Sequence, residues 1–353
     1  MEEKRKVKQK IKILPPEVLE KSHTYVELNF GKTYLTPSEE KRMNYLMCKG
    51  VHSDCSLYFT EGILKNPVKD NYQYQYAKRL KNKNIWVYHD KSRIAKRNIA
   101  SLTELLKKSL VLRSENQEVL SDRGIIVPSR VWRVGRSSEA SIFRRILRGE
   151  NSDFVVDVLI DASGSQMSRQ GEVALQAYMI SSALSNVGIP HRVMSYCTFW
   201  DYTILHRFRE YDDPQSKDED IFNYVTSSNN RDGLAFRAIR PLMEQYDAPH
   251  AKRIVLILTD ALPSDSRRAA SDHGLLRGKD YRDTLAIEDT REAIRQLRSE
   301  GICVAAIFWG GDYAVPSLRR IYGDSFIRIK QIQQFPDAVS SLLMRLLDQM
   351  HEQ

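Results

Sequence analysis

The stretch "FVVDVLIDASGSQMSRQG", residues 154–171, decides the fold class of this chain. A run of mostly apolar residues begins at Phe154 and ends in Asp161, and Ser163 and Ser165 follow at alternate positions before a helical stretch. A near-continuous apolar run of this length is typical of a parallel strand that is buried on both faces. The polar end of the strand raises the question of which ligand a carboxylate and two hydroxyls would bind there.

The same pattern of apolar runs alternating with amphipathic helices continues to the end of the chain. The further strands that we predict cover residues 192–199, 201–208, 253–260, 303–309 and 325–330. The helices that we predict cover residues 172–186, 234–245, 284–299, 317–322 and 335–350. Strands that alternate with helices predict an α/β domain with a doubly wound, mostly parallel, Rossmann-like sheet over residues 151–353.

The N-terminal part of the chain has a different composition. Residues 1–150 carry 31 Lys and Arg against 17 Asp and Glu, a net charge of +14, and the remaining residues have 23 against 28, or −5. Residues 1–98 show no sustained periodicity, so we expect a basic, partly helical region of undefined fold, followed by a helical and extended lead-in over residues 99–150. A basic surface of this kind suits an acidic protein partner or nucleic acid.

Composition also limits the compartment. The first ten residues are charged, and no apolar run approaches the roughly 18 residues that a membrane span needs. Four cysteines are too few for a disulfide scaffold in a chain of 353 residues. We therefore expect a cytoplasmic protein with no insertion into a membrane.

Polar side chains from three loops should meet at one edge of the predicted sheet, because doubly wound sheets bind ligands outside the carboxyl ends of their strands. These candidate ligands are Asp161, Ser163, Ser165, Asn230, Asp232 and Asp260. A set of oxygen donors without histidine or thiolate suits Mg²⁺, Mn²⁺ or Ca²⁺. A cation held by weak hydroxyl ligands keeps open positions, and a carboxylate of another protein can occupy one of them.

These residues resemble a known site. Asp161-Ala-Ser163-Gly-Ser165 resembles the D-x-S-x-S signature of von Willebrand factor A (vWA) domains. The metal-ion-dependent adhesion site of that family also uses a loop with a threonine and an Asp at the end of a later strand. Asp260 in "LTDALPSDS" matches that Asp. This chain has Asn230 and Asp232 where the family has the threonine, and Ala261 where Gly often follows the Asp. A third carboxylate at Asp232 would lower the positive charge left on the metal.

Two further segments narrow the resemblance. "NNRDGLAFRAI" and "LAIEDTREAIRQLRSEGICVAAI" are similar to segments of the cobaltochelatase accessory subunit and the nitric oxide reductase activation protein. The resemblance implies a non-enzymatic adaptor that works with an AAA+ ATPase, of the MoxR type in the second family, in the maturation or activation of a metalloenzyme. The chain has no G-x-x-x-x-G-K-[ST] motif and would not hydrolyse ATP itself.

Two other functions remain open at this level. The same site could serve a Mg²⁺-dependent hydrolase, with Asp232 or Asp265 as the general base. The basic N-terminal part could bind nucleic acid, with stacking surfaces on Tyr72, Tyr74, Tyr76 and Trp86.

Two segments outside the metal loops have candidate roles. Cys48, His52 and Cys55 supply three zinc-type ligands at short spacing, although structural zinc sites normally have four; a turn with two free thiols is the alternative. The polar segment 263–283 follows the third metal loop directly, and we interpret it as either a specificity element or a surface insertion.

Overall fold

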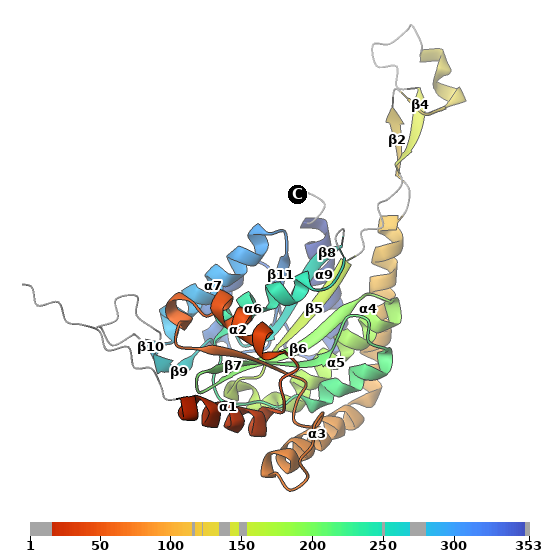
Figure 1. Ribbon diagram of the computed structural model, residues 1–353. Helices are drawn as coiled ribbons and strands as arrows, with labels where there is room; N and C mark the ends of the chain where they lie inside the picture. Colours follow the sequence, from red (N-terminus) through yellow and green to blue (C-terminus); the bar gives the residue numbers. More distant parts are fainter. Residues whose placement is uncertain are drawn as a thin grey trace, which may run out of the picture.

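The structure, a computed structural model, describes residues 16–114, 117–121, 123–133, 142–147, 154–248, 251–268 and 280–349. Its centre is a seven-stranded sheet with the order β1-β7-β6-β5-β8-β11-β12 (Figure 1). The strands of this sheet are β1 (Ser56–Thr60), β5 (Phe154–Asp161), β6 (His191–Phe199), β7 (Tyr202–Arg209), β8 (Lys252–Thr259), β11 (Cys303–Phe308) and β12 (Phe326–Arg328). Neighbouring strands are parallel except for β6 and β7, which form an antiparallel hairpin.

The predicted doubly wound, mostly parallel sheet is confirmed. Each of the six predicted strands corresponds to one observed strand, and their ends differ by a few residues at most. Every residue of β5 is buried, as the apolar run 154–161 predicted. The chain leaves β5 toward β6 on one side and later places β8 on the other side, so β5 lies at the switch point of the sheet.

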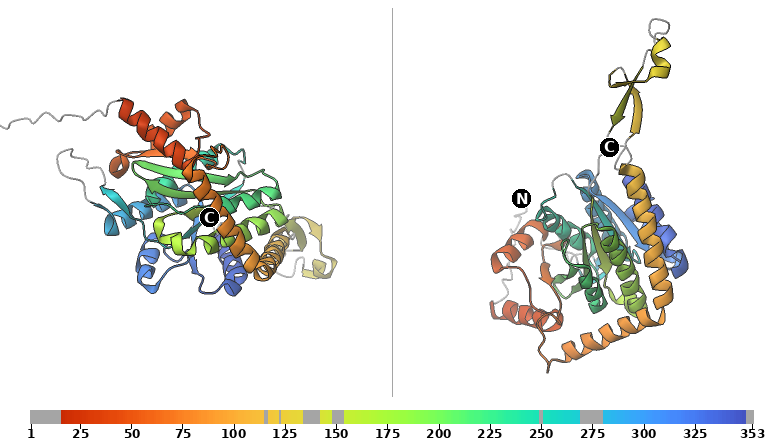
Figure 2. Two further views of the ribbon diagram at one scale, coloured as in Figure 1. Left: turned by 90° about the horizontal axis from the view of Figure 1, so that it is seen from below. Right: turned by 90° about the vertical axis from the view of Figure 1, so that its right-hand side faces the viewer.

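Helices cover both faces of the sheet, as Figure 2 shows from two further directions. One core lies between the sheet and α1, α3, α4, α5 and α9, and the other lies beneath α2, α6, α7 and α8. The helices are α1 (Pro16–Phe30), α2 (Pro37–Met47), α3 (Tyr72–Asp90), α4 (Ser92–Ser114), α5 (Gln170–Val187), α6 (Asp232–Glu244), α7 (Asp283–Ser299), α8 (Val315–Tyr322) and α9 (Phe335–Gln349). The five helices predicted after residue 151 are present as α5 to α9.

The N-terminal part contributes to the central sheet. β1 pairs with β7 in parallel and forms one edge of the sheet, a strand that the sequence pattern did not predict. The turn after α1 requires glycine at Gly31, where φ is +89° and a Cβ would lie 2.5 Å from the carbonyl carbon of Gly62. The boundary expected at residue 98 falls inside α4.

Two small sheets lie outside the central sheet in the described part of the chain. β2 (Gln117–Ser121), β3 (Ile125–Ile126) and β4 (Phe143–Leu147) form a small antiparallel sheet in the expected lead-in. β9 (Asp265–Arg268) and β10 (Asp280–Tyr281) pair after β8. Among the described helices, none is long and apolar enough to cross a membrane.

Candidate metal centre

The candidate metal centre lies where β5 and β8 end side by side. Asp161 is the last residue of β5, and Asp260 directly follows β8. Ser163 and Ser165 belong to the turn that opens a 3-10 helix, Gly164–Arg169, and Asp232 is the first residue of α6. The structure thus brings residues of three loops to one edge of the sheet, as the switch-point rule predicted.

Hydrogen bonds link the first and third loops directly. The backbone N–H of Ser163 donates to Asp161 Oδ1 over 2.9 Å, and the hydroxyls of Ser163 and Ser165 are 2.9 Å apart. The Ser165 hydroxyl donates to Asp260 Oδ2 over 2.5 Å. These contacts place two hydroxyl oxygens between two carboxylates, and Ser165 is exposed while both Asp side chains are buried.

Asn230 holds the second loop together through hydrogen bonds of its side chain. Its Nδ2 donates to Asp232 Oδ1 over 2.8 Å, and its Oδ1 accepts the N–H of Ser264 over 3.1 Å. Both amide atoms therefore take part in hydrogen bonds within the fold, and Asn230 positions Asp232. These contacts give Asn230 a positioning role toward Asp232, and its assignment as a metal ligand stays a prediction.

Two carboxylate oxygens of the site have no hydrogen-bond partner. Asp232 Oδ2 and Asp260 Oδ1 are buried and unpaired, which is costly for an ionised group. Burial first, and then the charge of Asp260, raise the pKa of Asp161 to about 7. Burial and the charges of Asp161 and Asp260 raise the pKa of Asp232 well above its usual range. A divalent cation would offset this repulsion and pair with the free oxygens, so the donors present fit such an ion.

The hydroxyls are necessary parts of the proposed ligand set. Within the described ranges, no group of three or more His, Cys, Asp and Glu side chains could by itself hold a metal ion. Asp161, Ser163, Ser165, Asp232 and Asp260 would hold the cation together. Hard oxygen donors of this kind suit Mg²⁺ or Mn²⁺, which when bound supplies an electrophilic position for an incoming carboxylate.

Three residues that support Asp161 and Asp260 were not identified from the sequence. The Thr259 hydroxyl donates to Asp161 Oδ2 over 3.2 Å, and the Tyr224 hydroxyl donates to the Asp161 carbonyl over 2.5 Å. Burial raises the pKa of Asp260, and the positive charge of Arg169 lowers it and so offsets part of this increase. Thr259 adjoins Asp260 in the sequence and could have been noticed, whereas nothing in the sequence connects Tyr224 to this site.

The turn after Asp260 has the backbone conformation that the glycine of the resembled family would favour. Ala261 has a φ of +57° and is completely buried. A left-handed conformation costs a residue with a Cβ roughly 1–2 kcal/mol. Ala261 therefore holds a conformation that glycine would adopt without this cost.

The residues of the two alternative sites, the hydrolase base and the zinc site, take part in other contacts. Asp265, one candidate base for a hydrolase, forms a buried ion pair with Arg231, with 2.5 Å between Oδ2 and Nε. His52 Nε2 lies 2.8 Å from Asp289 Oδ2, and the Cys48 thiol donates to Asn44 Oδ1 over 3.6 Å. Cys48, His52 and Cys55 lie in described segments and are not arranged as a metal site, so the zinc assignment is wrong. Burial raises the pKa of the Cys48 thiol to about 12, and none of the four cysteines, all in described segments, forms a disulfide.

The polar segment after the third metal loop is described in part. Residues 265–268 and 280–281 form the β9–β10 pair, and Asn230 pairs with Ser264 at its start. Residues 269–279, on which the choice between a specificity element and a surface insertion depends, lie outside the described residues.

Comparisons with known proteins give likenesses among solved structures only. The chain matches no family model and no curated protein. It is similar to proximal thread matrix protein 1 from the mussel byssus, with 16% identity over 55% of this chain and 47% of that chain, and a TM-score of 0.40. It is similar to the manganese-loaded TRAP protein of Plasmodium vivax, with 12% identity over 56% of this chain and 74% of that chain, and a TM-score of 0.39.

A third similar structure is the vWF domain of the type V pili tip protein Mfa5 from Porphyromonas gingivalis. The identity is 12% over 56% of this chain and 95% of that domain, with a TM-score of 0.41. The matched part is a little over half of this chain and about half of the mussel protein. Likenesses this weak do not define the fold, which follows from the strand order described above.

Proposed function

We propose that this chain is a vWA adaptor that binds a divalent cation, Mg²⁺ or Mn²⁺, and uses it to bind an acidic residue of a partner protein. The partner that we propose is a cytoplasmic AAA+ ATPase of the MoxR type, with a metalloenzyme as the target of the pair. The chain itself would act without catalysing a reaction.

The observation that carries this proposal is the pair of buried, unpaired oxygens, Asp232 Oδ2 and Asp260 Oδ1, beside the linked hydroxyls of Ser163 and Ser165. A protein interior rarely leaves ionised oxygens without a partner. An ion at this point would satisfy them and leave its solvent side open, next to the exposed Ser165. The D-x-S-x-S spacing at the switch point of the sheet supports the same proposal.

A binding experiment with the ATPase tests the adaptor role. The full chain is immobilised, and retention of a purified MoxR-type ATPase is measured with Mg²⁺, with a chelator, and with the Asp161→Ala variant. We expect retention with Mg²⁺ that falls at least tenfold in the other two conditions. Equal retention in all three conditions would remove the metal-dependent adaptor role.

A second candidate function rests on one face of α3. Tyr72, Arg79, Lys83 and Trp86 lie whole helical turns apart, so they share a face opposite the buried Ala77 and Asn84. Tyr72 is 69% exposed and Trp86 is 65% exposed. Cations that lie between exposed aromatic rings suit single-stranded nucleic acid, whose bases stack and whose phosphates pair with the cations. Tyr74 and Tyr76 are half-buried and offer less surface.

Fluorescence anisotropy with a labelled single-stranded oligonucleotide tests this second function. We expect binding at low salt that weakens steeply as salt is added, and that is lost in the Arg79→Glu and Trp86→Ala variants. Arg295→Glu, which reverses an exposed charge on α7, is the matched control. Absence of binding at low salt, or an equal loss in the control, would count against nucleic-acid binding.

A further inference from the structure

A buried arginine lies inside the second metal loop, between Asn230 and Asp232. The side chain of Arg231 is 1% exposed and is among the largest fully buried side chains of the described residues. Burying a guanidinium is costly unless its N–H groups are paired. The partners of Arg231 therefore fix where this loop can lie.

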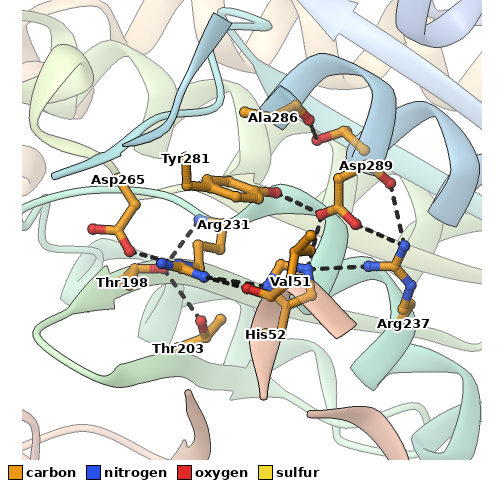
Figure 3. A network of polar contacts seen from close by, with 11 residues as sticks. Val51, His52, Thr198, Thr203, Arg231, Arg237, Asp265, Tyr281, Ala286 and Asp289 are labelled. Carbon is orange, nitrogen blue, oxygen red and sulfur yellow. Dashed lines mark hydrogen bonds and ion pairs between the residues drawn. The ribbon is translucent and has the colours of Figure 1, made fainter. Parts of the chain in front are cut away.

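Three segments far apart in the sequence provide these partners, as Figure 3 shows. Nε of Arg231 donates to Asp265 Oδ2 over 2.5 Å, and Nη1 donates to the carbonyl of Val51 over 3.2 Å. The guanidinium carbon lies 4.7 Å from the centre of the Tyr281 ring. The loop is thus tied to the N-terminal part and to the β9–β10 pair.

His52 extends the network to α7. Its Nδ1 lies 3.5 Å from Nη1 of Arg231, and its Nε2 lies 2.8 Å from Asp289 Oδ2. Burial lowers the pKa of His52, and in the neutral ring Nε2–H donates to Asp289 while Nδ1 faces Arg231. The hydroxyl of Tyr281 also donates to Asp289 Oδ2, over 2.6 Å.

Asp289 in turn lies against the residue that follows Asp232. A Cβ on Gly233 would be 2.0 Å from Asp289 Oδ2, so only glycine allows this approach. The network therefore touches the residues on both sides of Asp232, Arg231 and Gly233. Its side chains come from three places: the N-terminal part, the β9–β10 pair that follows β8, and helix α7 (Figure 3).

We propose that Arg231 and His52 are positioning residues of the metal centre, through which the N-terminal part fixes the loop that carries Asp232. This inference rests on the proposed cation site. It adds that the affinity for the cation depends on side chains that do not bind it, one of them about 180 residues before the loop in the chain.

Titration of the full chain with Mn²⁺, followed by electron paramagnetic resonance of the free ion, tests the proposal. We expect Arg231→Met and His52→Ala to weaken Mn²⁺ binding at least tenfold, with Arg231→Lys between wild type and Arg231→Met. The double variant should bind about as weakly as Arg231→Met, because both residues act through one network.

Arg192 provides a matched control. It is also buried, pairs with Asp157 over 2.7 Å and lies 4.7 Å from the ring of Tyr211, but it lies where β6 begins, away from the metal loops. Arg192→Met should lower stability to a similar extent and leave Mn²⁺ affinity within twofold of wild type. An equal loss of affinity in Arg192→Met, or unchanged affinity in the Arg231 and His52 variants, would overturn the positioning role.

Amide hydrogen exchange without metal separates this inference from the proposed function. Arg231→Met and His52→Ala should speed exchange of the backbone amides in residues 228–233 more than elsewhere in the sheet. If wild type binds no Mn²⁺, the proposed function fails, and the exchange result still decides the positioning role. Unchanged exchange in residues 228–233 would overturn it.

Discussion

Three carboxylates at the sheet edge, Asp161, Asp232 and Asp260, raise one another's energy when no cation is bound. Burial raises the pKa of each, and the charges of the neighbouring carboxylates raise those of Asp161 and Asp232 further. A raised pKa means that folding disfavours the ionised form. The site therefore lowers the stability of the metal-free chain. The carboxylates that would bind the cation therefore lower the free energy of unfolding when no cation is bound.

Replacing Asp260 by Asn should raise the stability of the metal-free chain at the expense of cation binding. The variant keeps the shape of the side chain but removes one of the repelling charges, so we expect the metal-free protein to gain about 1–2 kcal/mol in free energy of unfolding at pH 7 or above. It should lose its response to Mg²⁺. Urea unfolding with and without a chelator measures both effects. Asp247→Asn, an exposed residue beyond the far end of α6, should change neither, and a metal-free Asp260→Asn protein less stable than wild type would contradict the account.

His206 should make the protein sensitive to acid. Burial lowers its pKa from 6.5 to about 4, so between these values the unfolded chain binds a proton that the native chain does not. Stability is then lost as the pH falls from about 6.5 to about 4, by up to about 3 kcal/mol. We expect His206→Gln to unfold with a smaller loss over this range. Parallel pH profiles for wild type and variant would contradict the role of His206.

At the scale of elements, the strands that were predicted are those whose signal is local. β5 and β8 are nearly continuous apolar runs, which the requirement for burial on both faces dictates. β1 has the short sequence "SLYFT" and is buried because it pairs with β7, nearly 150 residues later. No local pattern reports such a partner, so the N-terminal edge of the sheet could not be predicted.

The metal centre, like the sheet, was predictable only where its residues adjoin strands with a local signal. Asp161 and Asp260 are each the last residue of a predicted strand, so the switch-point rule was enough to bring them together. The contact of Asn230 with the N–H of Ser264 could not be predicted, because the two residues adjoin only in the folded chain. The network of Arg231, His52 and Asp289 joins three distant segments and has no signature in the sequence.

The membership of β1 in the sheet has a measurable consequence. Phe59 is fully buried in β1, and Phe59→Ala should lower the free energy of unfolding by about 3–5 kcal/mol. Tyr45→Ala, in α2 with a side chain 78% exposed, should change it by less than about 0.5 kcal/mol. Chemical denaturation of both variants provides the measurement. If the two variants were equally stable, β1 would not be part of the folded core.

At the scale of the whole molecule, the cation should stabilise the entire fold. The candidate ligands come from three loops that join β5, α6 and β8, so an ion at this point holds the centre of the sheet together. An ion that binds only the native state adds about 2.7 kcal/mol at a concentration of 100 times its Kd. Thermal unfolding followed by circular dichroism should show a midpoint that rises with Mn²⁺ in wild type but not in Asp260→Asn. A midpoint that rises equally in both would indicate cation binding elsewhere.

The central claim is that the carboxylates and hydroxyls at the ends of β5 and β8 bind one divalent cation. Titration calorimetry of Mn²⁺ into wild type, Asp161→Ala and Asp260→Asn tests it most directly. We expect one ion per chain in wild type and at least a tenfold weaker uptake in each variant. No uptake by wild type, or uptake that the two substitutions leave unchanged, would contradict the claim.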